Sequence, residues 1–468
     1  MRDKKMVMIT LMLGTFMASL DSSIVNVSLP VMQKQFGISI AGIEWVITGY
    51  MISFCLFIPL TSWMKRRIGY YRLFLISIMI FTLGSLLCSL SSTIGFLVFS
   101  RIFQAIGGGA ISPTSLAILS EEFPQNEKGS AIGWWGIGNV MGPAIGPTLG
   151  GVLTHYFGWP CIFYINIPIG LLTIYLSTRH LGFLKNRPVT RPSFDVKGYT
   201  YFAIFIVVLQ YSLTAASDSG SGLWKCGIGF IASVISLVLF YRTTRYGVPL
   251  IDLSVFKSRI FVDCTIIILI RSLALYGGLF FIPFLLQGLM GYSEIQTGLL
   301  LLPNALIMLA LRPYAGRLAD RGIVRNPSLL GIALISVSML QFSVLDTGSS
   351  MVWVILGMIV RGTGMSFLVA PVSTTMLNSV TLEQTATATS LNSLFQQVGG
   401  SVGIALSGVL HISISHYFTT EGRAPAMAEH LALKAGFIIS AIVIAMALFP
   451  AKRLPERHNV KVSPIPIQ

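Results

Sequence analysis

Charged residues are scarce in this sequence. Only 10% of its 468 residues are charged, whereas 54% are hydrophobic. Soluble globular proteins carry roughly 25% charged residues, so this composition cannot cover a water-facing surface. The deficit excludes a cytosolic enzyme, a secreted disulfide-stapled domain and a disordered chain. The abundance of Phe, Met and Gly (29, 19 and 45 residues) is instead typical of a polytopic helical membrane protein.

Clustered cysteines, metal-binding patterns and nucleotide-binding motifs are missing too, although Cys161 and Cys226 both fall near predicted outer helix ends, where a pair could form. The five cysteines show no CxxC spacing, and Cys55, Cys88 and Cys264 lie inside apolar runs, so neither a disulfide framework nor a zinc site is expected. No GxxxxGK[ST] or HExxH motif is present, which argues against ATP hydrolysis and a metalloenzyme. We therefore expect no enzyme activity, cofactor or metal.

Long apolar runs recur along the whole chain instead. A helix needs about 20 mostly apolar residues to cross a bilayer. Fourteen runs qualify, at 6–29, 43–63, 73–91, 94–119, 131–155, 161–178, 198–216, 225–242, 261–287, 297–315, 328–346, 351–376, 387–413 and 431–450. The first run begins like a signal peptide, but it is longer than a typical one and contains Asp21, so an uncleaved helix is predicted.

The net charge of the chain is +15, and its Lys and Arg residues are distributed unevenly among the segments between these runs. With the N-terminus inside, 25 of the 32 basic residues fall in inner segments and four in outer ones. Cytoplasmic loops are enriched in Lys and Arg, so both termini are predicted to be cytoplasmic. Because the basic residues form short runs between apolar segments, a membrane-bound location in the plasma or inner membrane is favoured over nucleic-acid binding.

The two halves of the chain carry related patterns. The loop Ser62-Trp-Met-Lys-Arg-Arg-Ile-Gly69 resembles Gly316-Arg-Leu-Ala-Asp-Arg-Gly322, and about 40 residues after each comes an arginine within a span, Arg101 and then Arg361. These spacings predict a six-helix bundle over 1–197, two linking helices within 198–260 and a second six-helix bundle over 261–468. Repeats of this kind place a substrate site at mid-membrane between the halves.

Several motifs resemble the major facilitator superfamily, in particular its fourteen-helix drug:proton antiporter branch, the EmrB/QacA-like family. The segment 20–30, which contains Asp21 and Asn26, resembles the first-helix motif of the branch, and 163–170 resembles a segment that follows its antiporter motif. The residues that match the fourth-helix motif are Arg101, Gln104, Gly107 and Gly108. Those that match the antiporter motif are Gly138, Gly142, Pro143, Gly146, Pro147, Gly150 and Gly151.

The sequence departs from the family pattern in the first loop. Ser62 and Arg66 stand where the family has Gly and Asp. The second copy keeps Gly316, Asp320 and Arg321 but has Ile323 in place of a later Gly. The resemblance implies that the loop Asp belongs to a charge-relay latch, so the second copy alone is expected to supply it.

Asp21 and Arg101 are expected at nearly the same depth in the membrane. Helical rise places Asp21 about 22 Å from the inner face and Arg101 about 10 Å from the outer face of a core of about 30 Å. Burial favours the protonated form of a carboxyl group, whereas a nearby arginine favours the ionised form. This competition suits a proton-coupling site. The alternatives are a static structural pair or an Asp that caps a helix break.

Gly138, Gly142, Gly146 and Gly150 recur every four residues and predict a smooth stripe for close helix packing. Two further arginines, Arg271 and Arg361, are expected at mid-membrane depth without an acid at matching depth. They have either uncharged partners, such as backbone carbonyls or nearby Asn and Gln side chains, or a role in a net positive cavity that prefers neutral, zwitterionic or anionic amphiphiles. The candidate cavity residues are Asn26, Arg271, Arg361, Asn392 and Gln396.

Together these patterns predict a proton-coupled efflux antiporter of drugs and other small amphiphiles that works by alternating access. Its expected partners are protons, small amphiphilic substrates and the lipid bilayer, and a monomer is expected. Two alternatives are an exporter of a specific native lipid or anionic metabolite and a membrane receptor or scaffold that transports nothing.

Overall fold

The computed structural model describes residues 3–38, 40–190, 193–215, 222–246 and 251–456, and all regular elements within this part are helical. The helices of the first half are α1 (Lys4–Phe36), α2 (Ile40–Ser89), α3 (Ile94–Glu122), α4 (Gln125–Phe157), α5 (Cys161–Tyr164) and α6 (Asn166–His180). Then follow α7 (Val196–Ala215) and α8 (Gly222–Tyr246). The second half has α9 (Arg259–Pro283), α10 (Glu294–Asp320), α11 (Arg325–Ser343), α12 (Met351–Asn378), α13 (Thr385–Thr420), α14 (Pro425–Met446) and α15 (Leu448–Lys452).

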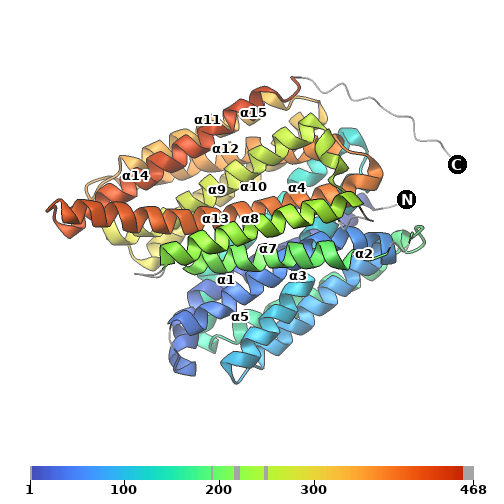
Figure 1. Ribbon diagram of the computed structural model, residues 1–468, viewed down its shortest axis with the longest axis horizontal. Helices are drawn as coiled ribbons and strands as arrows, with labels where there is room; N and C mark the ends of the chain where they lie inside the picture. The colour runs from blue at the N-terminus through green and yellow to red at the C-terminus, as the bar shows by residue number, and fades with distance from the viewer. Residues whose placement is uncertain (1–2, 39, 191–192, 216–221, 247–250, 457–468) are drawn as a thin grey trace.

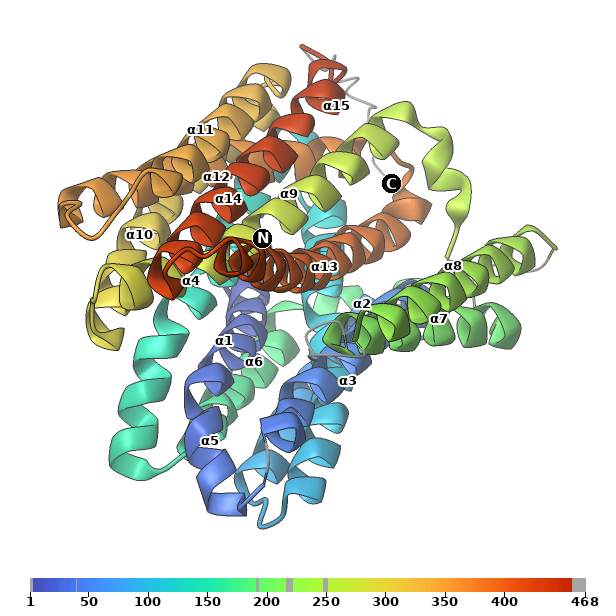
Figure 2. The same cartoon turned by 60° about the vertical axis from the view of Figure 1, so that its left-hand side comes forward.

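The helices gather into two groups, which we call the first bundle (α1–α6) and the second bundle (α9–α15). The first bundle lies on one side of the molecule and the second on the other (Figures 1 and 2). Helices α7 and α8 pack against each other at the outside, and α7 touches both α2 and α13. Gln210 of α7 donates a hydrogen bond to Ser401 of α13 at 3.1 Å. The α7–α8 pair therefore contacts both bundles.

Apolar side chains account for the helical membrane architecture. Eleven helical stretches within the described residues are long and apolar enough to cross a membrane. Outward-facing positions keep large apolar side chains, as on α8, where Phe230 and Ile231 are exposed. Since a water-facing helix would place polar residues there, α8 fits a surface that faces lipid. The prediction of an all-helical integral membrane protein is confirmed.

The described chain begins and ends at the same end of the molecule (Figure 1). Lys4 at the start of α1 forms an ion pair with Glu127 of α4 at 2.7 Å, and Arg325 of α11 pairs with Glu456 at 2.6 Å. We call this end the inner end. Helix α4 begins there and α10 finishes there, so these two helices run in opposite directions side by side.

The region between the second and third apolar runs differs from the expected loop. A single element, α2, covers 40–89, and the segment expected to be a loop is helical up to Ile68. The chain bends at Gly69, whose φ of 78° and ψ of 164° lie where residues with a Cβ are strongly disfavoured. A glycine at this position lets the chain change direction without a loop of several polar residues.

Replacing Gly69 with alanine tests this turn. The nearest atom to a Cβ added there, in Val189, is 3.7 Å away, so backbone strain rather than crowding opposes the change. We expect Gly69→Ala to cost about 1–3 kcal/mol and to lower the unfolding temperature in detergent. Gly95→Ala is the matched control, because Gly95 is helical and has no atom within 4 Å of an added Cβ. Equal stability of the two variants would contradict the role assigned to Gly69.

Candidate functional site

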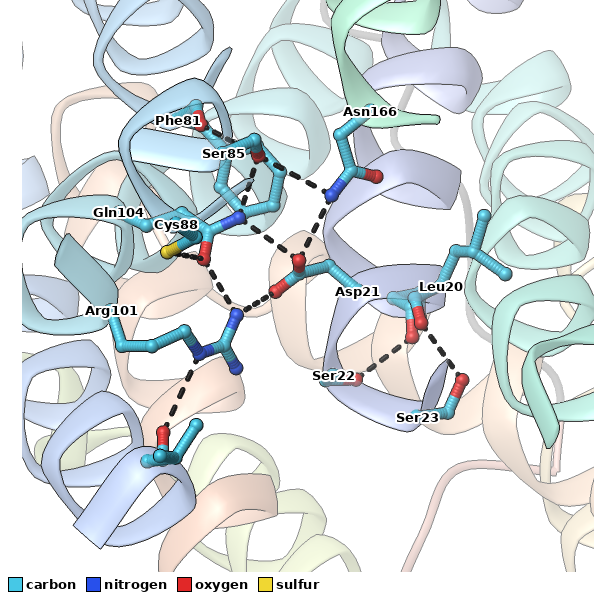
Figure 3. Close-up of polar contacts among 12 residues, drawn as sticks. Leu20, Asp21, Ser22, Ser23, Phe81, Ser85, Cys88, Arg101, Gln104 and Asn166 are labelled. Carbon is cyan, nitrogen blue, oxygen red and sulfur yellow. Dashed lines mark hydrogen bonds and ion pairs between the residues drawn. The ribbon is translucent and has the colours of Figure 1, made fainter. Parts of the chain in front are cut away.

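Asp21 lies in the middle of α1 and is completely buried. Its Oδ2 accepts a hydrogen bond from Nη1 of Arg101 on α3 at 2.6 Å, which makes a salt bridge. Its Oδ1 accepts hydrogen bonds from Nε2 of Gln104 and Nδ2 of Asn166, both at 2.9 Å (Figure 3). A buried charge is tolerated only when it is paired and hydrogen-bonded, and three donors meet this condition for Asp21.

Arg101 is held as tightly as the acid. The arginine is 1% exposed, and besides Asp21 it donates to Oε1 of Gln104 at 2.6 Å and to the Val46 carbonyl of α2 at 3.4 Å. Its guanidinium lies over the Tyr50 ring, 4.0 Å from the centroid. A cation over an aromatic face gains electrostatic stabilisation, and more so where water is excluded. The arginine is therefore fixed from several sides.

Glycines bring the helices of this network close enough for these contacts. A Cβ added to Gly107 of α3 would lie 2.7 Å from the backbone nitrogen of Phe81, and one added to Gly84 of α2 would lie 2.6 Å from Cα of Gln104. The backbones of α2 and α3 are thus in direct contact. This approach places Ser85 of α2 where it accepts a hydrogen bond from Gln104 at 2.7 Å and another from Asn166 at 3.3 Å.

The glycines of the antiporter motif, which belong to α4, pack against α1, the helix that carries Asp21. Cβ atoms added to Gly138 and Gly150 would lie 2.7 Å from the carbonyl oxygens of Met12 and Ile24, and one added to Gly142 would lie 2.5 Å from the nitrogen of Leu20. Gly146 also packs against α1, because a Cβ added there would lie 3.0 Å from Cβ of Ser23. Of the other predicted positions, Pro143 is exposed, Gly151 is half-buried and the Pro147 side chain lies outside the described part of the structure. Gly108 of α3 faces Tyr50 and Phe81.

Among the described residues, all side-chain partners of Asp21 come from the first bundle. Arg101 and Gln104 belong to α3 and Asn166 to α6. The Ser85 hydroxyl, which accepts hydrogen bonds from Gln104 and Asn166, belongs to α2. The acid therefore points into the first bundle rather than toward the second. A change in its protonation would act on the packing of α1 against α3 and α6.

The second loop copy joins the two bundles at the inner end. Asp320 at the end of α10 accepts hydrogen bonds from the backbone N–H groups of Gly129 and Ser130 in α4, the latter at 2.8 Å. The backbones also touch here, because a Cβ added to Gly316 would lie 3.0 Å from Cα of Ser130. Arg321, the third predicted latch residue, is exposed, and the structure records no side-chain contact for it within the described residues.

Other contacts close the same end. Lys128 of α4 donates to Oδ1 of Asn378 at the end of α12 at 3.1 Å. The hydroxyl groups of Thr61 in α2 and Ser390 in α13 are 2.5 Å apart. Since each pair joins the two bundles, the inner end is closed by polar contacts in addition to helix packing.

The predicted cavity residues of the second bundle are not brought together by hydrogen bonds. Arg361 of α12 donates to the carbonyl of Leu275 in α9 at 3.2 Å, which fits the backbone-carbonyl alternative. Arg271 of α9 has one recorded hydrogen bond, a 3.5 Å contact with Ser272. Asn392 is buried with its Oδ1 unpartnered, and Gln396 is half-buried. The Asn26 side chain lies outside the described part of the structure.

Several residues of these sites were missed by the sequence analysis. Asn166 lies within a segment noted only for its family likeness, and Ser85 is an ordinary serine in an apolar run. Arg312 falls inside the predicted span 297–315, but the sequence alone assigns it no role. It is buried within α10, 6% exposed, and its Nη1 donates to the carbonyl of Gly136 on α4. The signal was its position about two turns before the end of α10, beside Pro313.

Comparison with known proteins assigns this chain to a family. The family model described as Major Facilitator Superfamily matches residues 11–404. The riboflavin transporter RibZ of Clostridioides difficile is 33% identical over 383 residues, which is 81% of this chain and 82% of that protein. The multidrug resistance protein Stp of Mycobacterium tuberculosis is 31% identical over 409 residues, covering 87% of this chain and 76% of that protein.

A solved structure shows the same fold at low sequence identity. The human organic anion transporter MFSD10 superposes with a TM-score of 0.66 at 12% identity, and the alignment covers 96% of this chain and all of that one. The arrangement of helices is thus shared, whereas the residues of the sites have to be judged in this chain itself.

Asp320→Asn tests the contact at the inner end. Hydrogen bonds to a charged group contribute about 1.5–3 kcal/mol, so the substitution should shift the balance between closed and open inner ends on the order of ten- to a hundredfold. Spin labels at the exposed positions Asn126 and Asn326 would report the distance between the bundles. We expect a larger population of long distances in Asp320→Asn than in the wild type. The neighbouring control, Arg321→Gln, should show no such increase. A distance distribution that is the same in both variants would refute the latch.

Proposed function

The chain belongs to the major facilitator superfamily, in its branch of drug:proton antiporters, and on that premise we propose that it exports small amphiphilic compounds in exchange for protons. It is an integral membrane transporter rather than an enzyme. The observation that carries the proposal is the buried Asp21–Arg101 pair with its complete shell of donors. The name of the Stp relative, a multidrug resistance protein, supports efflux of varied compounds.

We propose fourteen membrane crossings with both termini in the cytoplasm. The count is supported if α2 crosses twice around Gly69 and α5 with α6 cross once. The excess of Lys and Arg at the inner end supports its cytoplasmic location. We divide the chain into bundles over 1–197 and 261–468, with the linking helices within 198–260. A monomer in the cell membrane, plasma or inner, is the proposed working form.

Proton coupling is proposed to act through Asp21. An ionised carboxylate in hydrocarbon needs the Arg101 charge and the amide donors, whereas a protonated acid does not. Protonation would therefore weaken the electrostatic attraction that holds α1 against α3 and α6. The glycine contacts between α1 and α4 transmit such a shift to a helix that also touches the second bundle at Asp320. In this scheme, the structure is the state closed at the cytoplasmic side.

The energetics are sufficient for uphill export. One elementary charge that crosses the membrane releases about 2.3 kcal/mol per 100 mV. A proton-motive force of about 180 mV thus supplies roughly 4 kcal/mol per proton, which sustains about a thousandfold substrate gradient. A single titrating carboxyl is enough for this amount of work.

A second candidate function is export of a specific native lipid or anionic metabolite. Arg271, Arg312 and Arg361 are buried in the second bundle, and the structure records no ion pair for any of them within the described residues. The name of the RibZ relative, a riboflavin transporter, is compatible with a dedicated substrate. This candidate keeps the same coupling site and differs only in the range of substrates.

Asp21→Asn tests the coupling site. The amide keeps the size of the carboxyl but carries no exchangeable charge, so we expect loss of pH-driven substrate efflux in proteoliposomes by at least tenfold. Substrate binding should persist. The control is Glu383→Gln, because Glu383 is exposed at the inner end and makes no recorded side-chain contact. Full uphill transport by Asp21→Asn would show that the proton is carried elsewhere, and absence of pH-driven flux in the wild type would favour a receptor or scaffold.

A further inference from the structure

Two aromatic rings lie over Arg101. The guanidinium carbon is 4.0 Å from the centroid of the Tyr50 ring on α2 and 5.5 Å from that of Phe163 on α5. Tyr50 is 2% exposed, and Phe163 is completely buried. A cation within about 6 Å of a ring face is attracted by it, most strongly where water is excluded. Both rings are therefore partners of the arginine charge.

The contact with Tyr50 is made by its ring and not by its hydroxyl. The hydroxyl oxygen is buried, and it has no hydrogen-bond partner among the described residues. One turn earlier on α2, the Val46 carbonyl accepts a hydrogen bond from Nε of Arg101 at 3.4 Å. A buried tyrosine hydroxyl usually finds a partner, so the packing at this position serves the ring face rather than the hydroxyl.

Asp21 provides the only counter-charge that pairs with Arg101 in the described part of the chain. When Asp21 takes up a proton, this counter-charge disappears while the guanidinium stays buried. A buried charge that loses its partner is strongly destabilising. The other hydrogen-bond acceptors of Arg101, on Gln104 and Val46, are neutral. An additional interaction that stabilises the arginine would therefore ease protonation of the acid.

The rings act differently on the two protonation states of the site. While Asp21 is ionised, its charge balances that of Arg101, and the negative face of a ring adds little to the pair. Once Asp21 is neutral, the guanidinium charge is unbalanced, and the same ring face stabilises it more strongly. The rings therefore favour the protonated state over the ionised state.

Few titratable groups besides Asp21 are directed at this site. Helices α2 to α6 all pack against α1, and among the described residues they direct Tyr50 and Cys88 of α2 and Arg101 of α3 at it. The titratable residues of α4 lie near its two ends. On α13, which packs on α3, His411 faces the aromatic residues of its own bundle and the others lie near the end of the helix. A signal specific to carboxyl groups therefore excludes these neighbours.

We propose that Tyr50 and Phe163 are positioning residues of the proton-coupling site. Their rings stabilise Arg101 while Asp21 is protonated, and they thereby raise the pH at which the acid takes up its proton. The inference rests on the proposed coupling through Asp21 and specifies which contacts stabilise its protonated state. Two side chains outside the hydrogen-bond network of the acid thus set the pH range in which the transporter works.

Infrared difference spectra recorded across pH test this role. The full chain is measured in phosphatidylcholine nanodiscs, and the C=O band of protonated Asp21 is identified by its loss in Asp21→Asn. We expect Tyr50→Leu to move the midpoint of this band to lower pH by about one unit, which is a roughly tenfold loss of proton affinity. Phe163→Leu should move it in the same direction by less, because its ring lies farther from the charge. If Tyr50→Leu does not fold, Phe163→Leu carries the test.

Two control variants separate the ring face from the hydroxyl and from packing. Tyr50→Phe keeps the ring, so its midpoint should match that of the wild type within about 0.3 unit, or about twofold in proton affinity. Phe81→Leu removes a completely buried ring of α2 that packs on α3 but lies over no charge in the part of the chain that the structure describes. It should lower the unfolding temperature and leave the midpoint in place.

The inference is overturned if neither Tyr50→Leu nor Phe163→Leu shifts the midpoint, if Phe81→Leu shifts it equally, if Tyr50→Phe shifts it as far as Tyr50→Leu does, or if the wild type shows no titrating Asp21 band. These measurements do not depend on transport. An unshifted midpoint together with loss of efflux in Asp21→Asn refutes the role of the rings and leaves the proposed function standing. Full efflux by Asp21→Asn refutes the proposed coupling, whatever the position of the midpoint.

Discussion

A single buried carboxyl group, paired with an arginine, constrains the structure of the first bundle. Asp21 is stable there only because Arg101, Gln104 and Asn166 direct their donors at its two oxygens. Those donors come from α3 and α6, so three helices must meet around one side chain. The cost of an unpaired charge in this environment is several kcal/mol, so the packing of α1, α3 and α6 depends on keeping these donors around the carboxyl group.

The glycine stripes follow from the same constraint. A carboxylate and a guanidinium reach each other across α1 and α3 only if the neighbouring helices approach closely, and Gly84, Gly107 and Gly142 permit that approach. On α4, the outer half packs on α1 while the inner half contacts α10 through Gly129. One helix therefore touches both the acid-bearing helix and the opposite bundle. In the proposed mechanism, a displacement of α1 would reach the inner closure through α4 without a separate relay of side chains.

The sequence was sufficient to predict the helical membrane fold and the pairing of Asp21 with Arg101, because both rest on simple quantities. Hydropathy indicates helices, and helical rise gives depth. Three features were beyond it. The turn at Gly69 depends on one φ angle, and Asn166 contributes through tertiary contact rather than spacing. The sequence also gives no sign that Arg312 reaches the Gly136 carbonyl of α4. Each depends on how helices pack in three dimensions, which local patterns do not record.

The two bundles also divide their charges unequally. The first contains a neutralised pair, and the second contains arginines for which the described residues provide no acid. The proposed proton-carrying group thus lies in the first bundle, apart from these arginines. In the proposed mechanism, proton and substrate are coupled through helix packing rather than through direct competition for one side chain.

The most direct test of the account is infrared difference spectroscopy of the carboxyl group of Asp21 when a transported substrate binds. The account predicts loss of a protonated-carboxyl C=O band in the wild type at a pH where the acid is partly protonated, and absence of that change in Asp21→Asn. Persistence of the same band change in Asp21→Asn, or binding of substrate with no change in any carboxyl band, would contradict it.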